Sequence, residues 1–159
     1  MATLARPAWG SIVSRGATAG IIGGITIDVY LWLTTLIPAH TPITAMWQFV
    51  ASTAFGKGAL TNPSFIWVGL AMHLIVSIGW GIGYAYIAAS SPAIANRWIT
   101  SGIVYGIVVY AIMSLILLAD NNFTYPSSPN AFVNAIAAHA IFFGLPVAFV
   151  INRSSRAAA

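Results

Sequence analysis

The sequence contains no cysteine and only two acidic residues, Asp28 and Asp120, among 159 residues. Without cysteine the chain forms no disulfide, presents no thiolate nucleophile and binds no Fe–S cluster or covalently attached haem. The scarcity of carboxylates argues against conventional enzyme chemistry, because no nucleophile stands beside a recognisable base. We therefore favour a non-enzymatic role and leave enzymatic activity as an open alternative.

Charged residues of either sign are also rare, and apolar residues dominate. Charged residues make up 5% of the chain and hydrophobic residues 59%, with a mean hydropathy of +0.88. This composition is typical of integral membrane proteins, since one water-soluble core could not bury so much apolar surface. About twenty apolar residues span a hydrocarbon core of about 30 Å. We expect a single membrane domain, residues 1–159, whose spanning helices are 12–37, 65–90, 97–118 and 131–152.

The first outer loop, residues 39–64, contains a segment of a different kind. Thr41 is a candidate N-cap, Pro42 suits the first helical position, and Gly56 is expected to end a helix. Apolar residues recur between them at helical spacing, which favours a short interfacial helix over a lid on the bundle. The expected fold class is an all-α membrane protein, an up-and-down bundle of four transmembrane helices with this short helix in the first outer loop.

Basic residues gather on one side of the predicted bundle, and Lys57 alone lies opposite. By the positive-inside rule both termini face the cytoplasm, which predicts a multi-pass protein of the bacterial inner membrane. The expected partners are the lipid bilayer and its anionic headgroups, and no basic stripe interleaved with aromatics indicates nucleic acid. The arginines on the terminal side are Arg6, Arg15, Arg97, Arg153 and Arg156.

An internal repeat relates the two halves of the chain. Laying Arg15 on Arg97 aligns the first span with the third, and laying His73 on His139 aligns the second with the fourth. The chain is therefore expected to be two tandem helical hairpins of the same orientation, related by an axis along the membrane normal. Under this alignment the equivalent pairs are Gly20 and Gly102, Gly24 and Gly106, and Asp28 and Tyr110.

Each span contributes one polar residue at a similar depth, roughly 13 to 15 Å below its outer end at 1.5 Å per residue. A charged Asp facing lipid would cost roughly 2.5 kcal/mol or more, so these side chains are expected to face inward. The alternative role is hydrogen bonding between helices, worth about 0.6 kcal/mol on average. This predicted polar layer consists of Asp28, His73, Tyr110 and His139.

Two segments, HLIVSIGWGIGYAYIAASSPAI and NAIAAHAIFFGLPVAFVINR, resemble the YagU-like family of bacterial inner-membrane proteins. The likeness covers about residues 65–153 and depends mainly on a histidine early in each of two spans. It implies a four-span inner-membrane protein linked to acid tolerance. The positions that the resemblance carries over are His73, Ser77, Gly83, Tyr84 and His139.

Several functions fit the polar layer. The first is a ligand site or a proton or ion pathway, whose histidines change charge near pH 6 to 7. Four spans are few for a monomeric transporter, so this function requires a homo-oligomer or a very small pore. A second is haem b held by His73 and His139, with Gly24 and Gly106 making room for the ring. A third is a metal site of both histidines and Asp28. The last is a scaffold or accessory subunit of a larger membrane complex.

Overall fold

The structure of the protein is a computed structural model that describes residues 9–119 and 128–156, with side chains as far as residue 154. These residues form helices and turns, and four of the helical units are long and apolar enough to cross a membrane. The prediction of an all-α protein with four spans is confirmed. The spans are α1 (Trp9–Leu31) continued by a π-helical turn (Trp32–Leu36), α3 (Phe65–Ser90), α5 (Trp98–Ala119), and α6 (Pro129–His139) continued by a π-helical turn (Ala140–Gly144) and α7 (Leu145–Arg156).

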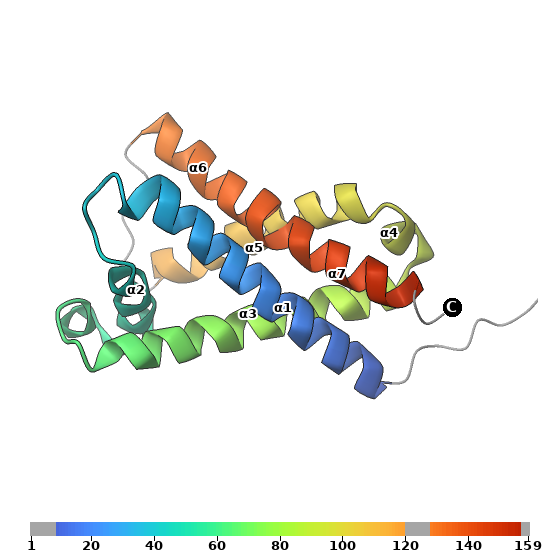
Figure 1. Cartoon of the computed structure of the whole chain (residues 1–159), viewed down its shortest axis with the longest axis horizontal. Coiled ribbons are helices and arrows are strands. Elements are labelled where there is room, and N and C mark those ends of the chain that lie inside the picture. The colour runs from blue at the N-terminus through green and yellow to red at the C-terminus, as the bar shows by residue number, and fades with distance from the viewer. Residues whose placement is uncertain (1–8, 120–127, 157–159) are drawn as a thin grey trace, which may run out of the picture.

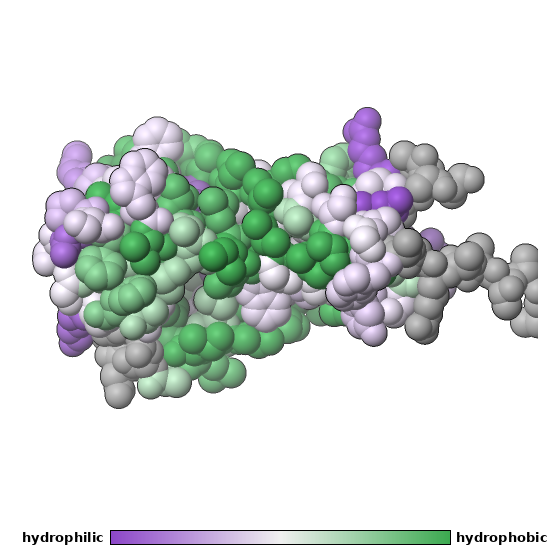
Figure 2. All heavy atoms as spheres, turned by 90° about the horizontal axis from the view of Figure 1, so that it is seen from below, coloured by the Kyte–Doolittle hydropathy of each residue, from purple (hydrophilic) through white to green (hydrophobic). Residues whose placement is uncertain are grey.

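The spans run along the long axis of the molecule, and α1 crosses α3 obliquely (Figure 1). The start of α1 and the end of α7 lie at one end, which we call the terminal end, together with the short helix α4 (Pro92–Asn96). The opposite end, here the loop end, carries α2 (Thr44–Phe55) beside the start of α3. On the face shown in Figure 2 apolar side chains form a broad middle zone between more hydrophilic ends, as a bilayer requires.

The loop helix α2 begins later than the sequence predicts. Its N-cap is Ile43, which makes no side-chain cap bond, so the expectation of a cap at Thr41 and a first turn at Pro42 is wrong. The Thr41 hydroxyl instead donates to the Ala39 carbonyl at 3.2 Å, which draws it away from the helix. Gly56 ends the helix as expected, with φ 77°, a conformation that glycine adopts without steric cost.

The crossing of α1 with α3 brings the two backbones into direct contact. A Cβ added to Gly20 would lie 2.7 Å from Ile78 Cα, and one added to Gly16 would lie 2.5 Å from Ile82 Cα. From the other side, a Cβ on Gly81 would lie 2.5 Å from the Gly20 amide nitrogen. Small residues permit this approach, and in lipid such close packing replaces the hydrophobic driving force between helices.

A second crossing of the same kind joins α5 to the fourth span. A Cβ on Gly106 would lie 2.6 Å from Ala140 Cα, and one on Gly144 would lie 2.7 Å from the Gly106 amide nitrogen. A Cβ on Gly102 would lie 2.7 Å from Ala148 Cβ and 2.9 Å from the Gly144 carbonyl oxygen. Both pairs of spans are therefore held together at glycines.

The fourth span contains a proline, and the first span compensates for it. Pro146 has no amide hydrogen, so the Phe142 carbonyl one turn earlier lacks its helical donor. The Thr26 hydroxyl on α1 donates to that carbonyl at 2.5 Å. In a membrane a freed backbone group needs such a neighbour, and this contact ties α1 to the π-helical turn Ala140–Gly144.

Candidate functional site

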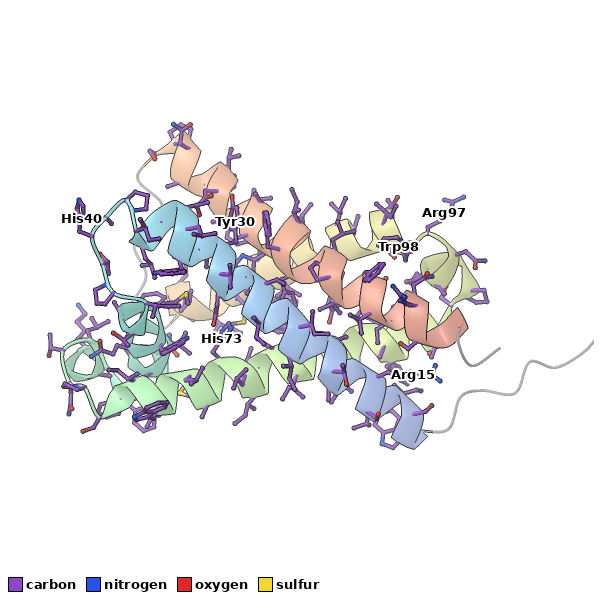
Figure 3. The ribbon with its side chains drawn as sticks, viewed as in Figure 1. Arg15, Tyr30, His40, His73, Arg97 and Trp98 are labelled. Atoms are coloured by element: carbon purple, nitrogen blue, oxygen red, sulfur yellow. The ribbon has the colours of Figure 1, made fainter. Side chains whose placement is uncertain are left out.

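Two residues of the predicted polar layer, Asp28 on α1 and His73 on α3, form an ion pair. His73 Nε2 lies 3.0 Å from Asp28 Oδ1, and the side chains are 19% and 13% exposed, respectively. Figure 3 shows His73 between the ribbons of α3 and α1, towards the loop end. The pair follows from the glycine crossing, because Gly20 and Gly24 let α3 approach α1 two turns and one turn before Asp28, respectively.

The carboxylate of Asp28 also contacts the loop helix α2. The Trp47 indole Nε1 donates to Asp28 Oδ2 at 3.3 Å. The helix α2 also packs closely on the start of α3, where a Cβ on Gly69 would strike the Trp47 carbonyl. The two oxygens of the Asp28 carboxylate therefore contact two different helices: Oδ1 contacts α3 and Oδ2 contacts α2.

The surroundings of His73 indicate which ring nitrogen carries hydrogen. Nε2 lies 3.0 Å from Asp28 Oδ1 and 3.4 Å from the Gly24 carbonyl, and both of these oxygens are acceptors. A nitrogen placed between two acceptors is protonated, because a bare lone pair there would be repelled by both. We therefore assign the Nε2–H form to His73 on hydrogen-bonding grounds.

The other two residues of the layer, Tyr110 on α5 and His139 at the end of α6, form a second pair. Their ring centroids are 5.3 Å apart at an interplanar angle of 57°. His139 Nδ1 lies 2.9 Å from the Ala135 carbonyl of its own helix, so it donates there and leaves Nε2 as the acceptor nitrogen. Tyr110 itself is buried, with 8% of its surface exposed.

Two buried side-chain atoms in the described residues lack a hydrogen-bond partner, and both belong to the polar layer. They are Asp28 Oδ1 and Tyr110 Oη. The Asp28 oxygen is close enough to His73 for an ion pair, but their contact lacks the alignment of a hydrogen bond. Buried polar atoms are nearly always satisfied, so exceptions are candidates for a bound water, ion or exchangeable proton.

The layer is thus arranged as two pairs, Asp28 with His73 and Tyr110 with His139. Within the described residues no hydrogen bond or ion pair joins the two pairs, and the charge of His73 acts on His139. A haem does not fit this arrangement. The space in front of Gly24 is taken by Ser77, whose Oγ would lie 2.9 Å from an added Cβ. The space in front of Gly106 is taken by the backbone of the fourth span, so these glycines serve close packing and leave no room for a flat ring.

The residues proposed as a metal site do not come together as three ligands. Within residues 9–119 and 128–156, no group of three or more His, Cys, Asp or Glu side chains is placed to hold a metal ion. His73 and Asp28 supply two neighbouring donors, and His139 lies with Tyr110 instead. Two protein donors are fewer than the three that a catalytic zinc site uses.

Sequence reasoning missed Trp47 as part of this site. The helical spacing places Trp47 among the apolar residues of the predicted interfacial helix, whereas in the structure its indole nitrogen contacts Asp28. The available signal was chemical: a Trp carries a single donor that seeks an acceptor when buried, and the chain has only two acidic side chains to offer one.

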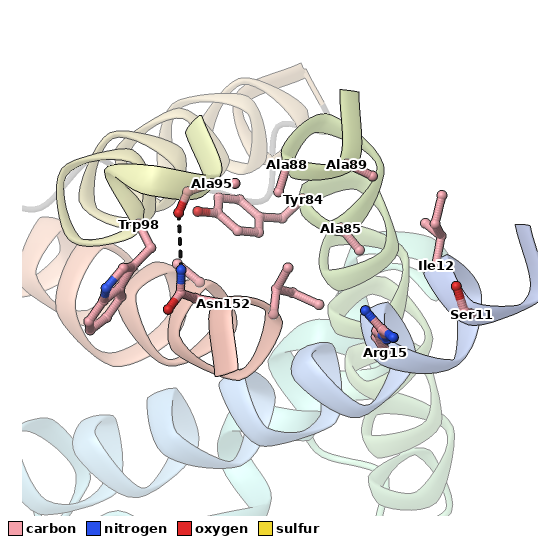
Figure 4. A pocket seen from close by; sticks show the side chains of 12 residues that line it. Ser11, Ile12, Arg15, Tyr84, Ala85, Ala88, Ala89, Ala95, Trp98 and Asn152 are labelled. Carbon is pink, nitrogen blue, oxygen red and sulfur yellow. Dashed lines mark hydrogen bonds between the residues drawn. The ribbon is translucent and has the colours of Figure 1, made fainter. Parts of the chain in front are cut away.

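A separate small cavity of about 70 Å³ lies at the terminal end (Figure 4). Arg15 borders it from α1 and Trp98 from α5, and Asn152 spans one wall by donating to the Ala95 carbonyl at 3.1 Å. A cavity of this size holds a few waters and no larger ligand. We therefore treat this cavity as separate from the polar layer.

Comparison of the chain with models of protein families, with characterised proteins and with solved structures finds no match.

Proposed function

We propose that the protein provides a proton or ion pathway through the membrane, with the Asp28–His73 pair as its exchange site. The observation that carries the proposal is the Asp28–His73 ion pair, with 3.0 Å between His73 Nε2 and Asp28 Oδ1, largely buried between two membrane-spanning helices. Ionisable residues inside a membrane span are costly and typically mark such pathways.

The chemistry of the exchange step follows from the tautomer of His73. Its Nε2–H faces Asp28 and the Gly24 carbonyl, which leaves Nδ1 as the nitrogen that takes up a second proton. The imidazolium formed in this way is stabilised by the carboxylate 3.0 Å away. Trp47 holds the other carboxylate oxygen and so keeps Asp28 in place during the exchange.

The second pair continues the pathway. The ring of His139, with Nε2 as its acceptor nitrogen, lies beside the ring of Tyr110, and the Tyr110 hydroxyl has no partner among the described residues. Transfer between the two pairs requires water, and the unsatisfied atoms Asp28 Oδ1 and Tyr110 Oη are the polar partners that such water needs.

The setting that we propose is the bacterial inner membrane, with both termini in the cytoplasm and α2 lying in the opposite interface. The excess of arginine at the terminal end supports this orientation. The repeated glycine crossing supports a construction from two tandem hairpins. A role in acid tolerance, implied by the resemblance to YagU-like proteins, would suit a histidine site; four spans suggest a homo-oligomer or a larger complex.

The test is proton flux into liposomes that contain the purified protein and a trapped pH-sensitive dye, driven by an acid pulse with valinomycin and potassium to balance charge. We expect flux above that of empty liposomes in the wild type. Asp28→Asn and His73→Asn are each expected to lower it at least about ten-fold, the change that about 1.4 kcal/mol produces in a rate.

The matched control is His40→Asn, which removes the third histidine at an exposed loop-end position with φ 51°, a conformation that Asn tolerates. This variant should leave the flux unchanged, and all three variants should elute and melt as folded protein. Wild-type flux equal to that of empty liposomes, or full flux in Asp28→Asn, would refute the proposal.

A scaffold or accessory subunit is the second candidate, favoured by the contacts that join the first and fourth spans. Tyr30 Oη donates to Asn134 Oδ1 at 2.6 Å, the Tyr30 ring stacks on Phe142 at 3.9 Å, and Thr26 binds the fourth span as described. In this role the polar layer fixes helix register only. Wild-type liposomes without flux, combined with loss of stability in Asp28→Asn, would favour it.

A further inference from the structure

A deep apolar groove lies between α3 and α5, separate from the polar layer. Its volume is about 780 Å³. It exists because α3 packs mainly on α1 and α2, while α5 packs mainly on the fourth span. Two contacts bridge α3 and α5 along it: Tyr105 donates to the Trp80 carbonyl at 2.6 Å, and the hydroxyls of Tyr84 and Ser101 are 2.8 Å apart.

Glycines leave part of the groove wall open. A Cβ added to Gly79 would meet no atom within 4 Å, so this position faces empty space. At Gly83 an added Cβ would meet only the Tyr105 hydroxyl, at 3.1 Å. In a bilayer an apolar space of this kind is filled by hydrocarbon, because it has no groups to hold water.

One end of the groove is cationic. Arg97, at the terminal end, lines it together with Thr100 and Ser101. Among the described residues Asp28 carries the only side-chain carboxylate, and it pairs with His73 towards the loop end, away from Arg97. Along α5 the distance from Arg97 to Ile112, the last residue that lines the groove, is about 22 Å at 1.5 Å per residue. Half a bilayer, with its headgroup region, is about 20 to 22 Å deep, so the groove is about as long as one leaflet.

We propose that this groove binds one anionic phospholipid, with its phosphate on Arg97 and Thr100 and an acyl chain lying past Gly83 towards Gly79. The charge at one end and the apolar length beyond it match the two parts of such a lipid. Arginine is well suited to phosphate because its planar donors bind two oxygens at once. The proposal is independent of proton exchange at Asp28.

The test is native mass spectrometry of the purified protein in detergent with equal amounts of phosphatidylglycerol and phosphatidylcholine. The wild type should retain one phosphatidylglycerol. Gly79→Phe should abolish retention by filling the groove, and it should still fold because the added side chain has open space. Arg97→Gln should lower retention about five-fold, the effect of one basic residue near an anionic lipid.

Two controls separate this site from general affinity for lipid. Gly10→Phe adds the same side chain at another unobstructed helical glycine, and Arg153→Gln removes an exposed arginine at the same end of the molecule. Both should retain the lipid, and a photoactivatable phosphatidylglycerol should label peptides containing Val104 or Val108. The proposal would be overturned by equal retention of the two lipids or by labelling outside the groove. It would also be overturned if the wild type were a dimer without bound lipid and Gly79→Phe abolished that dimer.

Discussion

The crossing of α1 with α3 and the crossing of α5 with the fourth span use the same backbone contacts but carry different polar groups. In the first, a Cβ on Gly20 would strike the Ser77 carbonyl, and in the second a Cβ on Gly106 would strike the His139 carbonyl. Ser77 and His139 therefore occupy equivalent places. His73, one turn before Ser77, has Ala135 as its counterpart in the fourth span.

This displacement by one helical turn decides the chemistry of each half. His73 meets a carboxylate on the facing helix, whereas His139 reaches only the Ala135 carbonyl of its own helix and the ring of Tyr110. If Gly20 is equivalent to Gly106, the residue of α5 equivalent to Asp28 is Ser114, which is buried but uncharged. One scaffold thus supports an ion pair in one half and a neutral pair in the other.

The largest expected effect comes from breaking the crossings themselves. Gly20→Ala and Gly106→Ala place a methyl group 2.7 Å from Ile78 Cα and 2.6 Å from Ala140 Cα, where backbone must move. We expect each to lower the free energy of unfolding in detergent by about 3 kcal/mol, at the upper end of overpacking effects. Gly10→Ala, with nothing within 4 Å, should be neutral or stabilising. Equal stability of all three variants would show that these contacts are not tight.

The contact that joins the two halves comes next. Thr26→Val removes the hydroxyl that donates to the Phe142 carbonyl. Since Pro146 has no amide hydrogen to replace it, the variant should lower the unfolding free energy by about 2 kcal/mol. Thr18→Val, which loses only a bond to the Ser14 carbonyl of its own helix, should cost much less. Adding Pro146→Ala restores an amide hydrogen in the fourth span. The double variant Thr26→Val with Pro146→Ala should therefore be more stable than the sum of the two single effects predicts. A purely additive result would contradict this account.

The contact of Trp47 with Asp28 has a smaller effect on stability. Trp47→Phe keeps an aromatic ring but removes the Nε1 donor, and we expect a loss of about 1 kcal/mol in unfolding free energy. Trp67→Phe is the control, because that side chain is 74% exposed and makes no contact described above. In Asp28→Asn the effect of Trp47→Phe should shrink, since the acceptor loses its charge. The same loss in both backgrounds would show that the indole acts by packing alone.

The smallest effect is expected for Tyr110. Its hydroxyl is buried without a partner, so Tyr110→Phe should change the unfolding free energy by less than about 0.5 kcal/mol or raise it. Tyr84→Phe, which removes a hydroxyl 2.8 Å from Ser101, should cost about 1 kcal/mol. The water proposed for transfer is needed only while a proton moves. A large loss in Tyr110→Phe would mean that a resident water or another chain satisfies this hydroxyl.

Much of the fold could be read from hydropathy, because the length and composition of a span are local properties of the chain. The span predicted for residues 65–90 coincides with α3 (Phe65–Ser90). The start of α2 was misplaced, since a threonine next to a proline resembles a helix start, and the Thr41 hydroxyl has a nearer acceptor in the Ala39 carbonyl.

That the four polar residues form one functional site stays a prediction, and the sequence could not tell how they pair: Asp28 with His73, and Tyr110 with His139. The alignment that placed His73 on His139 maximised identity between the halves, whereas the contacts at the crossings relate Ser77 to His139. Sequence identity does not report which turn of one helix meets which turn of another. That register is set by where small residues let two backbones touch.

The sequence by itself determined that this is a four-span membrane protein, because nothing but a bilayer accommodates so much apolar surface with so few charges. It also shows that acidic side chains and histidines are rare in the spans, which makes Asp28, His73 and His139 the candidates for chemistry there. Only the tertiary structure decided that Asp28 pairs with His73, that Trp47 reaches the same carboxylate, and that a groove ending at Arg97 opens between α3 and α5. These are properties of helix crossings, and a crossing depends on the contact between two distant segments.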